Sequence, residues 1–176
     1  MAVEFSEKAD AEFKELVSRY PNTLAAMLPA LHLAQREFGW ISVEVMDYIA
    51  ERLEVHPTKV LNAATFYTMY NKSPVGKCHV QVCTTLTCAL RGGYELLEDL
   101  EEKLGVKLGE TREDGAYTLS EAECLASCGT APMFQASFSD GEIEYFENLD
   151  SDERVNAVVE KLNARLASLP DPRKMH

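Results

Sequence analysis

Cysteines are the residues of this chain best suited to chemistry, and four of its five cysteines form two close pairs. The pairs are Cys83-Thr-Thr-Leu-Thr-Cys88 and Cys124-Leu-Ala-Ser-Cys128, each following a run that is typical of a β-strand. Four deprotonated thiolates are the usual ligand set of an iron–sulfur cluster. Zinc knuckles and thioredoxin-type dithiols often have two residues between their cysteines. The spacing therefore favours a cluster, and it leaves a zinc site or unreactive thiols open.

The side chains next to these cysteines are small or carry hydroxyl groups, as in Thr84, Thr85, Thr87, Ser127 and Gly129. Such residues let backbone N–H groups approach the sulfurs, and these hydrogen bonds help to set a reduction potential. None of the 4 histidines lies at motif spacing from a cysteine, so ligation by histidine is not expected. With thiolate ligands alone, the predicted potential is low.

The fifth cysteine, Cys78, lies on the predicted strand that leads to Cys83. Strand side chains alternate between faces, so Cys78 and Cys83 point to opposite sides of a sheet. We therefore interpret Cys78 as a packed core thiol and not as a ligand.

At these residues the chain resembles the thioredoxin-like 2Fe–2S ferredoxin family. The resemblance rests on Val82–Cys88 and Glu123–Met133, with support from Phe38–Ile41 and Ala64–Tyr67, and it runs over about residues 10–165. Within the family, the chain is most similar to the peripheral iron–sulfur subunits of bacterial NADH–quinone oxidoreductase, or respiratory complex I. One departure is Ala126, where the family usually has Gly. Ala is tolerated there at negative φ and costs about 1 kcal/mol or more at positive φ.

The resemblance implies one 2Fe–2S cluster held by Cys83, Cys88, Cys124 and Cys128, with each pair binding one iron. It implies an electron-transfer subunit of an oxidoreductase that has no NADH or quinone site of its own. FMN and NADH would bind only to a partner flavoprotein subunit of the same complex. The complex would place the chain in the cytoplasm, peripheral to the inner membrane.

Two other functions are compatible with the same motifs. The chain could be an accessory diaphorase subunit of an NAD-dependent hydrogenase or formate dehydrogenase. It could also be a zinc-stapled interaction module without a redox role. No dinucleotide-binding glycine motif, P-loop or nucleophile elbow is present, so the chain is not expected to oxidise NADH alone.

The segments that position the second half of the chain alternate between strand and helix patterns. Strands are predicted at Lys77–Cys83, Ala116–Ala122, Met133–Phe138 and Glu142–Phe146, with Asp140-Gly141 as a hairpin turn. Helices are predicted after Gly92-Gly93 as far as Gly105, and from an Asp150/Glu153 capping box to Leu166. This order is compatible with a thioredoxin-like domain, and the resemblance selects that fold.

The first half of the chain shows helical periodicity. Helices are expected from Phe5 to Tyr20, from near Thr23 to Gly39, after Ser42 and after Pro57. The aromatic stretch Phe66–Tyr70 is expected to be mainly core, or else part of a partner surface. The predicted class is α/β (α+β overall): a helical bundle for partner docking at residues 1–72, a thioredoxin-like domain at 73–168 and a tail at 169–176.

Composition excludes several other classes of function. The net charge is −12, and residues 77–176 carry 19 acidic against 10 basic side chains. Such a surface repels nucleic acid and anionic lipid, and it suits either solubility or attraction of a basic partner. No long apolar run predicts a membrane span, and the N-terminus does not resemble a secretory signal. In a reducing compartment, paired cysteines favour a metal over disulfides.

Overall fold

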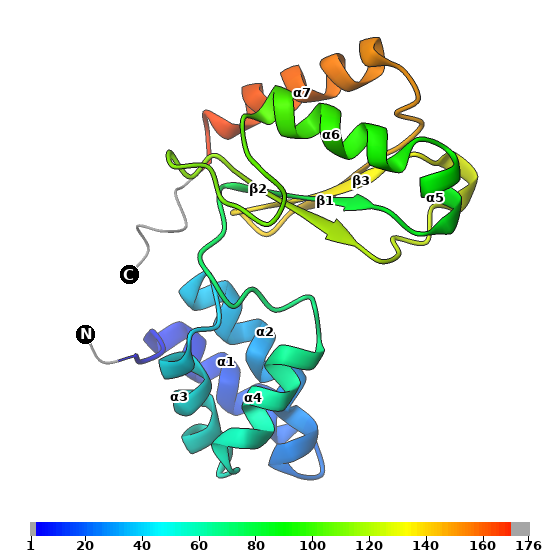
Figure 1. Cartoon of the computed structure of the whole chain (residues 1–176). Coiled ribbons are helices and arrows are strands. Elements are labelled where there is room, and N and C mark those ends of the chain that lie inside the picture. The colour runs from blue at the N-terminus through cyan, green and yellow to red at the C-terminus, as the bar shows by residue number, and fades with distance from the viewer. Residues whose placement is uncertain (1–2, 170–176) are drawn as a thin grey trace. The chain divides into compact units, whose positions relative to one another are not determined.

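The structure is a computed structural model that describes residues 3–169. The chain divides into two compact units after Pro74 (Figure 1), close to the boundary expected after residue 72. Of the predicted tail at 169–176, only Leu169 lies within the described residues, and its side chain is buried. Among residues 3–169, none of the helices combines the length and the apolar character needed to cross a membrane.

The first unit is helical. Its elements within residues 3–74 are α1 (Glu7–Ser18), the 3₁₀ helix η1 (Thr23–Ala26), α2 (Met27–Phe38), α3 (Val43–Leu53) and α4 (Pro57–Phe66). The expected caps are confirmed at Ser42, whose side chain accepts a hydrogen bond from the Val45 N–H, and at Pro57 in the first turn of α4. Thr23 is not a cap, because Asn22 caps η1 instead and accepts from the Ala25 N–H.

The aromatic stretch at the end of α4 divides between core and surface. Tyr70 is 1% exposed and donates a hydrogen bond to the Leu28 carbonyl at 2.8 Å, so it belongs to the core as predicted. The prediction is wrong for Phe66 and Met69, which are 77% and 51% exposed. Phe66 is the last residue of α4 and lies away from the side of the helix that buries Val60 and Ala64, and Met69 follows the end of the helix.

The second unit contains a mixed sheet with strand order β2-β1-β3-β4. Its elements within residues 75–169 are β1 (Cys78–Cys83), α5 (Leu86–Leu90), α6 (Gly93–Leu104), β2 (Tyr117–Ala122), the 3₁₀ helix η2 (Cys128–Thr130), β3 (Phe134–Phe138), β4 (Ile143–Phe146) and α7 (Asp152–Leu166). Strand β1 lies parallel to β2 and antiparallel to β3, which pairs antiparallel with β4. The α/β class is therefore confirmed.

Helices α6 and α7 cover one face of this sheet (Figure 1). The core between them joins Val80 and Val82 of β1 to Leu100 of α6 and Leu162 of α7, all essentially inaccessible. The opposite face is more polar, as shown by the 2.7 Å hydrogen bond between His79 and Ser120.

The start of α7 differs from the predicted capping box. Ser151 is the N-cap residue, and its side chain makes no capping hydrogen bond. The Asp150 carboxylate instead accepts a hydrogen bond from Arg154 at 2.8 Å. A charged partner one turn along the helix therefore takes the place of the backbone N–H that Asp150 was expected to bind.

Candidate iron–sulfur site

The parallel pairing of β1 and β2 brings the two cysteine loops together. Both strands run in the same direction, so their C-terminal ends lie at the same edge of the sheet. Cys83 is in register with Ala122, and the Thr84 N–H donates to the Ala122 carbonyl at 3.3 Å. Only one residue separates Ala122 from Cys124 in the chain. Figure 1 shows α5 and the loop between β2 and β3 at this same end of the sheet.

The first cysteine pair is buried. Cys83 ends β1 and is 3% exposed, and Cys88 lies within the short helix α5 and is 1% exposed. Gly93, the first residue of α6, packs directly against this loop. A Cβ at Gly93 would lie 2.9 Å from the Cys88 carbonyl carbon and oxygen and 3.0 Å from the Cys83 carbonyl oxygen. Glycine is therefore required there by close backbone approach, a role that the sequence alone did not reveal.

The second cysteine pair is exposed to solvent. Cys124 and Cys128 flank a tight loop in which Ala126 has φ of 59°. The loop thus has the left-handed conformation that favours glycine, and the Ala126 methyl group is under strain. In return, the Ala126 N–H points at the Cys124 sulfur, with N···S at 3.4 Å. Backbone N–H groups directed at sulfur favour the thiolate form.

Cys83 receives hydrogen bonds from both loops. Burial raises the pKa of its thiol, but hydrogen bonds from the backbone of Thr85, from the Cys88 thiol and from the backbone of Leu125 outweigh burial and leave this pKa below its ordinary value. Leu125 belongs to the second loop, so its N–H joins the two loops at the Cys83 sulfur. The thiolate, which is the form that binds metal, is stabilised at this position.

Cys88 shows that all four sulfurs share one electrostatic environment. Burial raises the pKa of its thiol most, and the hydrogen bond to Cys83 adds to the rise. With the negative charge on Cys83, Cys128 and Cys124, these effects together bring the pKa to about 12. Four thiolates this close repel one another, and a bound cationic centre would relieve that repulsion.

Cys78 lies apart from this group, as predicted. It is fully buried in the core beneath α6 and α7, on the face of β1 opposite to Cys83. Burial raises the pKa of this thiol to about 12, so it remains protonated at neutral pH. An inert core thiol accounts for these properties.

Comparison with known proteins agrees with this geometry. The family model described as thioredoxin-like [2Fe-2S] ferredoxin matches residues 13–163. The chain belongs to the thioredoxin-like [2Fe-2S] ferredoxin family. The match extends from the helical unit through the whole sheet, so both units are part of the family's architecture.

Several relatives of this thioredoxin-like ferredoxin are named as a subunit of NADH-quinone oxidoreductase. The Rickettsia conorii protein is 43% identical over 152 residues, covering 85% of this chain and 87% of the relative. The Rickettsia bellii protein is 39% identical over 161 residues, covering 90% and 93%. The Rickettsia felis protein is 40% identical over 151 residues, covering 84% and 87%.

A solved structure shows the same fold in a longer chain. The air-oxidised form of an NAD⁺-reducing [NiFe]-hydrogenase superposes with a TM-score of 0.63 at 18% sequence identity. The superposition covers 82% of this chain and 24% of the hydrogenase chain. At that level of identity the likeness concerns the fold alone.

The donor set suits a binuclear ferredoxin cluster. A 2Fe–2S cluster needs four protein ligands, two on each of its irons. Two cysteine pairs on adjacent loops, none of them in a disulfide, meet that demand.

One polar group beside the ferredoxin site was missed by sequence reasoning. The Glu147 carboxylate accepts hydrogen bonds from the hydroxyls of Ser127 and Thr130, which flank Cys128. Glu147 follows β4 and is 20 residues from Ser127 in sequence, so no local motif connects them. The pKa of Glu147 is lowered by these two hydrogen bonds, and the group is therefore a carboxylate at neutral pH.

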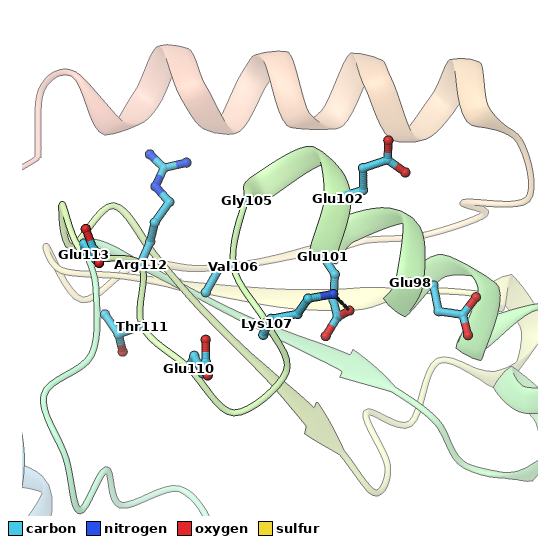
Figure 2. A pocket seen from close by; sticks show the side chains of 10 residues that line it. All are labelled: Glu98, Glu101, Glu102, Gly105, Val106, Lys107, Glu110, Thr111, Arg112 and Glu113. Atoms are coloured by element: carbon cyan, nitrogen blue, oxygen red, sulfur yellow. Dashed lines mark hydrogen bonds and ion pairs between the residues drawn. The ribbon is translucent and has the colours of Figure 1, made fainter.

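Away from the cysteines, a surface hollow of about 930 Å³ lies between α6 and the loop that follows it (Figure 2). Its charged lining residues are Glu98, Glu101, Glu102, Lys107, Glu110, Arg112 and Glu113. Both cations are already paired, Lys107 with Glu101 at 2.8 Å and Arg112 with Asp114 at 2.7 Å. Carboxylates predominate in this hollow, so it does not favour phosphate-bearing ligands such as NADH or FMN.

Proposed function

We propose that this chain is an electron-transfer subunit that carries one 2Fe–2S cluster beside the FMN- and NADH-binding subunit of NADH–quinone oxidoreductase. The observation that carries the proposal is the parallel pairing of β1 and β2, which brings the two cysteine loops to one edge of the sheet. The relatives named as subunits of that oxidoreductase support the choice of complex.

In this proposal Cys83 and Cys88 hold one iron, and Cys124 and Cys128 hold the other. When bound, such a cluster takes up and releases single electrons. The chain's own contribution is to favour the thiolate at Cys83 and to bury the first pair. The N–H groups of Thr85, Leu125 and Ala126 direct positive dipoles at the sulfurs. Their number and direction help to determine how readily an electron is accepted.

The partner is proposed to dock in part on the helical unit. Leu61 and Phe66 of α4 and Met69 just after it are 45%, 77% and 51% exposed. Large apolar side chains exposed close together in sequence are typical of a surface that a protein partner covers. The excess of acidic residues in the second unit favours a partner with basic groups at the contact. The complex would hold the chain in the cytoplasm, peripheral to the inner membrane.

Analysis of the purified chain tests the cluster. We expect two irons and two acid-labile sulfides per chain, visible absorption and a rhombic electron paramagnetic resonance signal after reduction. Replacing any of Cys83, Cys88, Cys124 or Cys128 by Ser should weaken or abolish these signals. Cys78→Ser is the matched control and should retain them. Loss of colour in the Cys78 variant, or silence after verified reduction of the wild type, would contradict the proposal.

Two measurements separate the alternatives. A zinc-stapled module would be colourless and would contain zinc in place of iron and sulfide. Co-purification distinguishes NADH–quinone oxidoreductase from a hydrogenase or formate dehydrogenase, because the partner recovered with the chain identifies the complex. A Phe66→Asp variant should reduce that recovery while the cluster spectrum stays unchanged.

A further inference from the structure

The second cysteine loop is fastened to the rest of the unit by a carboxylate. The Thr130 hydroxyl donates to Glu147 Oε1 at 2.6 Å, and the Ser127 hydroxyl donates to the same oxygen. The two hydroxyls also lie 3.2 Å from each other. We call Ser127, Thr130 and Glu147 the hydroxyl–carboxylate clamp. Ser127 precedes the ligand Cys128 directly, so the clamp acts within one residue of a sulfur ligand.

Backbone hydrogen bonds hold the same two segments together. The Asn148 N–H donates to the Thr130 carbonyl at 2.7 Å, and the Leu149 N–H donates to the Pro132 carbonyl at 3.0 Å. These bonds fasten Thr130 at the end of η2 and Pro132 after it, and the clamp extends the attachment to Ser127, inside the loop between the cysteines. Such an attachment has a clear use here, because both cysteines of this loop are exposed and Ala126 is strained.

The clamp also places a negative charge beside the second cysteine pair. Glu147 makes its side-chain hydrogen bonds with neutral hydroxyls, so its charge is not cancelled by the groups that it binds. Taking up one electron makes a cluster more negative. A carboxylate close by therefore disfavours the reduced form and lowers the reduction potential.

We propose that Glu147 is a positioning residue that fixes the Cys124–Cys128 loop through Ser127 and Thr130 and holds the reduction potential of the cluster low. The inference rests on the proposed function, since it presupposes a cluster on the four cysteines. It assigns two separable effects to one side chain. The hydrogen bonds determine how firmly the loop is held, and the charge determines how readily an electron is accepted.

The charge is tested with Glu147→Gln, which keeps an oxygen acceptor for the hydroxyls and removes the negative charge. Glu160→Gln is the matched control, because Glu160 is an exposed carboxylate on α7. Potentials are measured by redox titration of the purified chain, followed by electron paramagnetic resonance. We expect Glu147→Gln to shift the one-electron equilibrium roughly three- to tenfold toward the reduced form, or about 30–59 mV. Glu160→Gln should shift it less than twofold.

The hydrogen bonds are tested with the double variant Ser127→Ala/Thr130→Val, which keeps the charge and removes the hydroxyls. Iron release to an added chelator should become roughly three- to tenfold faster, and the potential should shift less than in Glu147→Gln. Far-UV circular dichroism confirms that each variant is folded.

The outcomes distinguish this inference from the function on which it rests. If the wild type holds no iron and sulfide, the proposed function fails. If the wild type holds a cluster, and Glu147→Gln matches Glu160→Gln in potential, the electrostatic role is refuted. If the double variant releases iron at the wild-type rate, the positioning role is refuted.

Discussion

Replacement of Gly93 by Ala tests the packing that holds the first cysteine loop. The added Cβ would lie 2.9 Å from the Cys88 carbonyl carbon and oxygen and 3.0 Å from the Cys83 carbonyl oxygen. Carbon atoms in favourable contact are separated by about 3.5–4.0 Å. These neighbours are backbone atoms, which cannot rotate away as the end of a flexible side chain can. Either α6 or the loop that carries Cys83 and Cys88 must therefore move.

The expected change in the free energy of unfolding of Gly93→Ala is the sum of two opposing effects. Overpacking a well-packed site costs about 1–3 kcal/mol. Ala is a better helix former than Gly by up to about 1 kcal/mol, and less of this gain applies to Gly93 because it is the first residue of α6. We expect a net loss of about 1–2 kcal/mol in the free energy of unfolding. For a unit of this size, each kcal/mol lowers the melting temperature by roughly 4–8 °C.

The assay is thermal unfolding of the chain together with iron and sulfide analysis. Gly129→Ala is the matched control, because Gly129 adjoins Cys128 but has no neighbour within 4 Å of a built Cβ and no positive φ. Gly129→Ala should leave the melting temperature and the iron content near wild type. Gly93→Ala should lower both. Equal behaviour of the two variants would refute the argument from close approach.

Two further predictions concern strain and pH. Ala126→Gly should raise the free energy of unfolding by about 0.5–1 kcal/mol. Removing the backbone strain of Ala at φ of 59° should stabilise the folded chain by more than the added entropy of Gly stabilises the unfolded chain. An unchanged melting temperature would contradict this. Burial lowers the pKa of His79 to about 4, against about 6.5 in the unfolded chain. Below about pH 6.5 the unfolded chain therefore binds a proton that the native chain does not, and stability falls between about pH 6.5 and 4 by up to about 3 kcal/mol. The free energy of unfolding, measured by urea denaturation at each pH in this range, should depend less steeply on pH for His79→Gln than for the wild type. An identical dependence on pH in the two proteins would exclude His79 as the cause.

Helix ends were predicted correctly where the residue that begins or ends the helix acts on backbone groups close to it in the sequence. Ser42 at an N-cap, Pro57 in a first turn and Gly105 at a left-handed C-cap each act within a few residues of their own position. Helix α5 was missed because Leu86–Leu90 is too short to show helical periodicity and has no side-chain cap. The start of α7 was misjudged because Arg154 competes for the carboxylate of Asp150.

For the candidate site, too, the sequence predicted what depends on neighbouring residues and not what depends on contacts between distant ones. Residue type and spacing were enough to nominate the four cysteines and to set Cys78 aside by strand alternation. The register of Cys83 with Ala122 was not encoded in any local motif, because it depends on a parallel pairing across the intervening α6. The same holds for the approach of Gly93 to Cys88 and for the bond between Glu147 and Ser127, which only the folded chain brings together.

The unequal burial of the two cysteine pairs makes them unequally accessible to reagents in solution. Cys83 at the end of β1 and Cys88 within α5 are buried against the start of α6, whereas Cys124 and Cys128 are exposed to solvent. Reagents in solution that attack or bind thiols should therefore reach Cys124 and Cys128 more readily than Cys83 and Cys88. An alkylating reagent added to the chain without a cluster should label the second pair first.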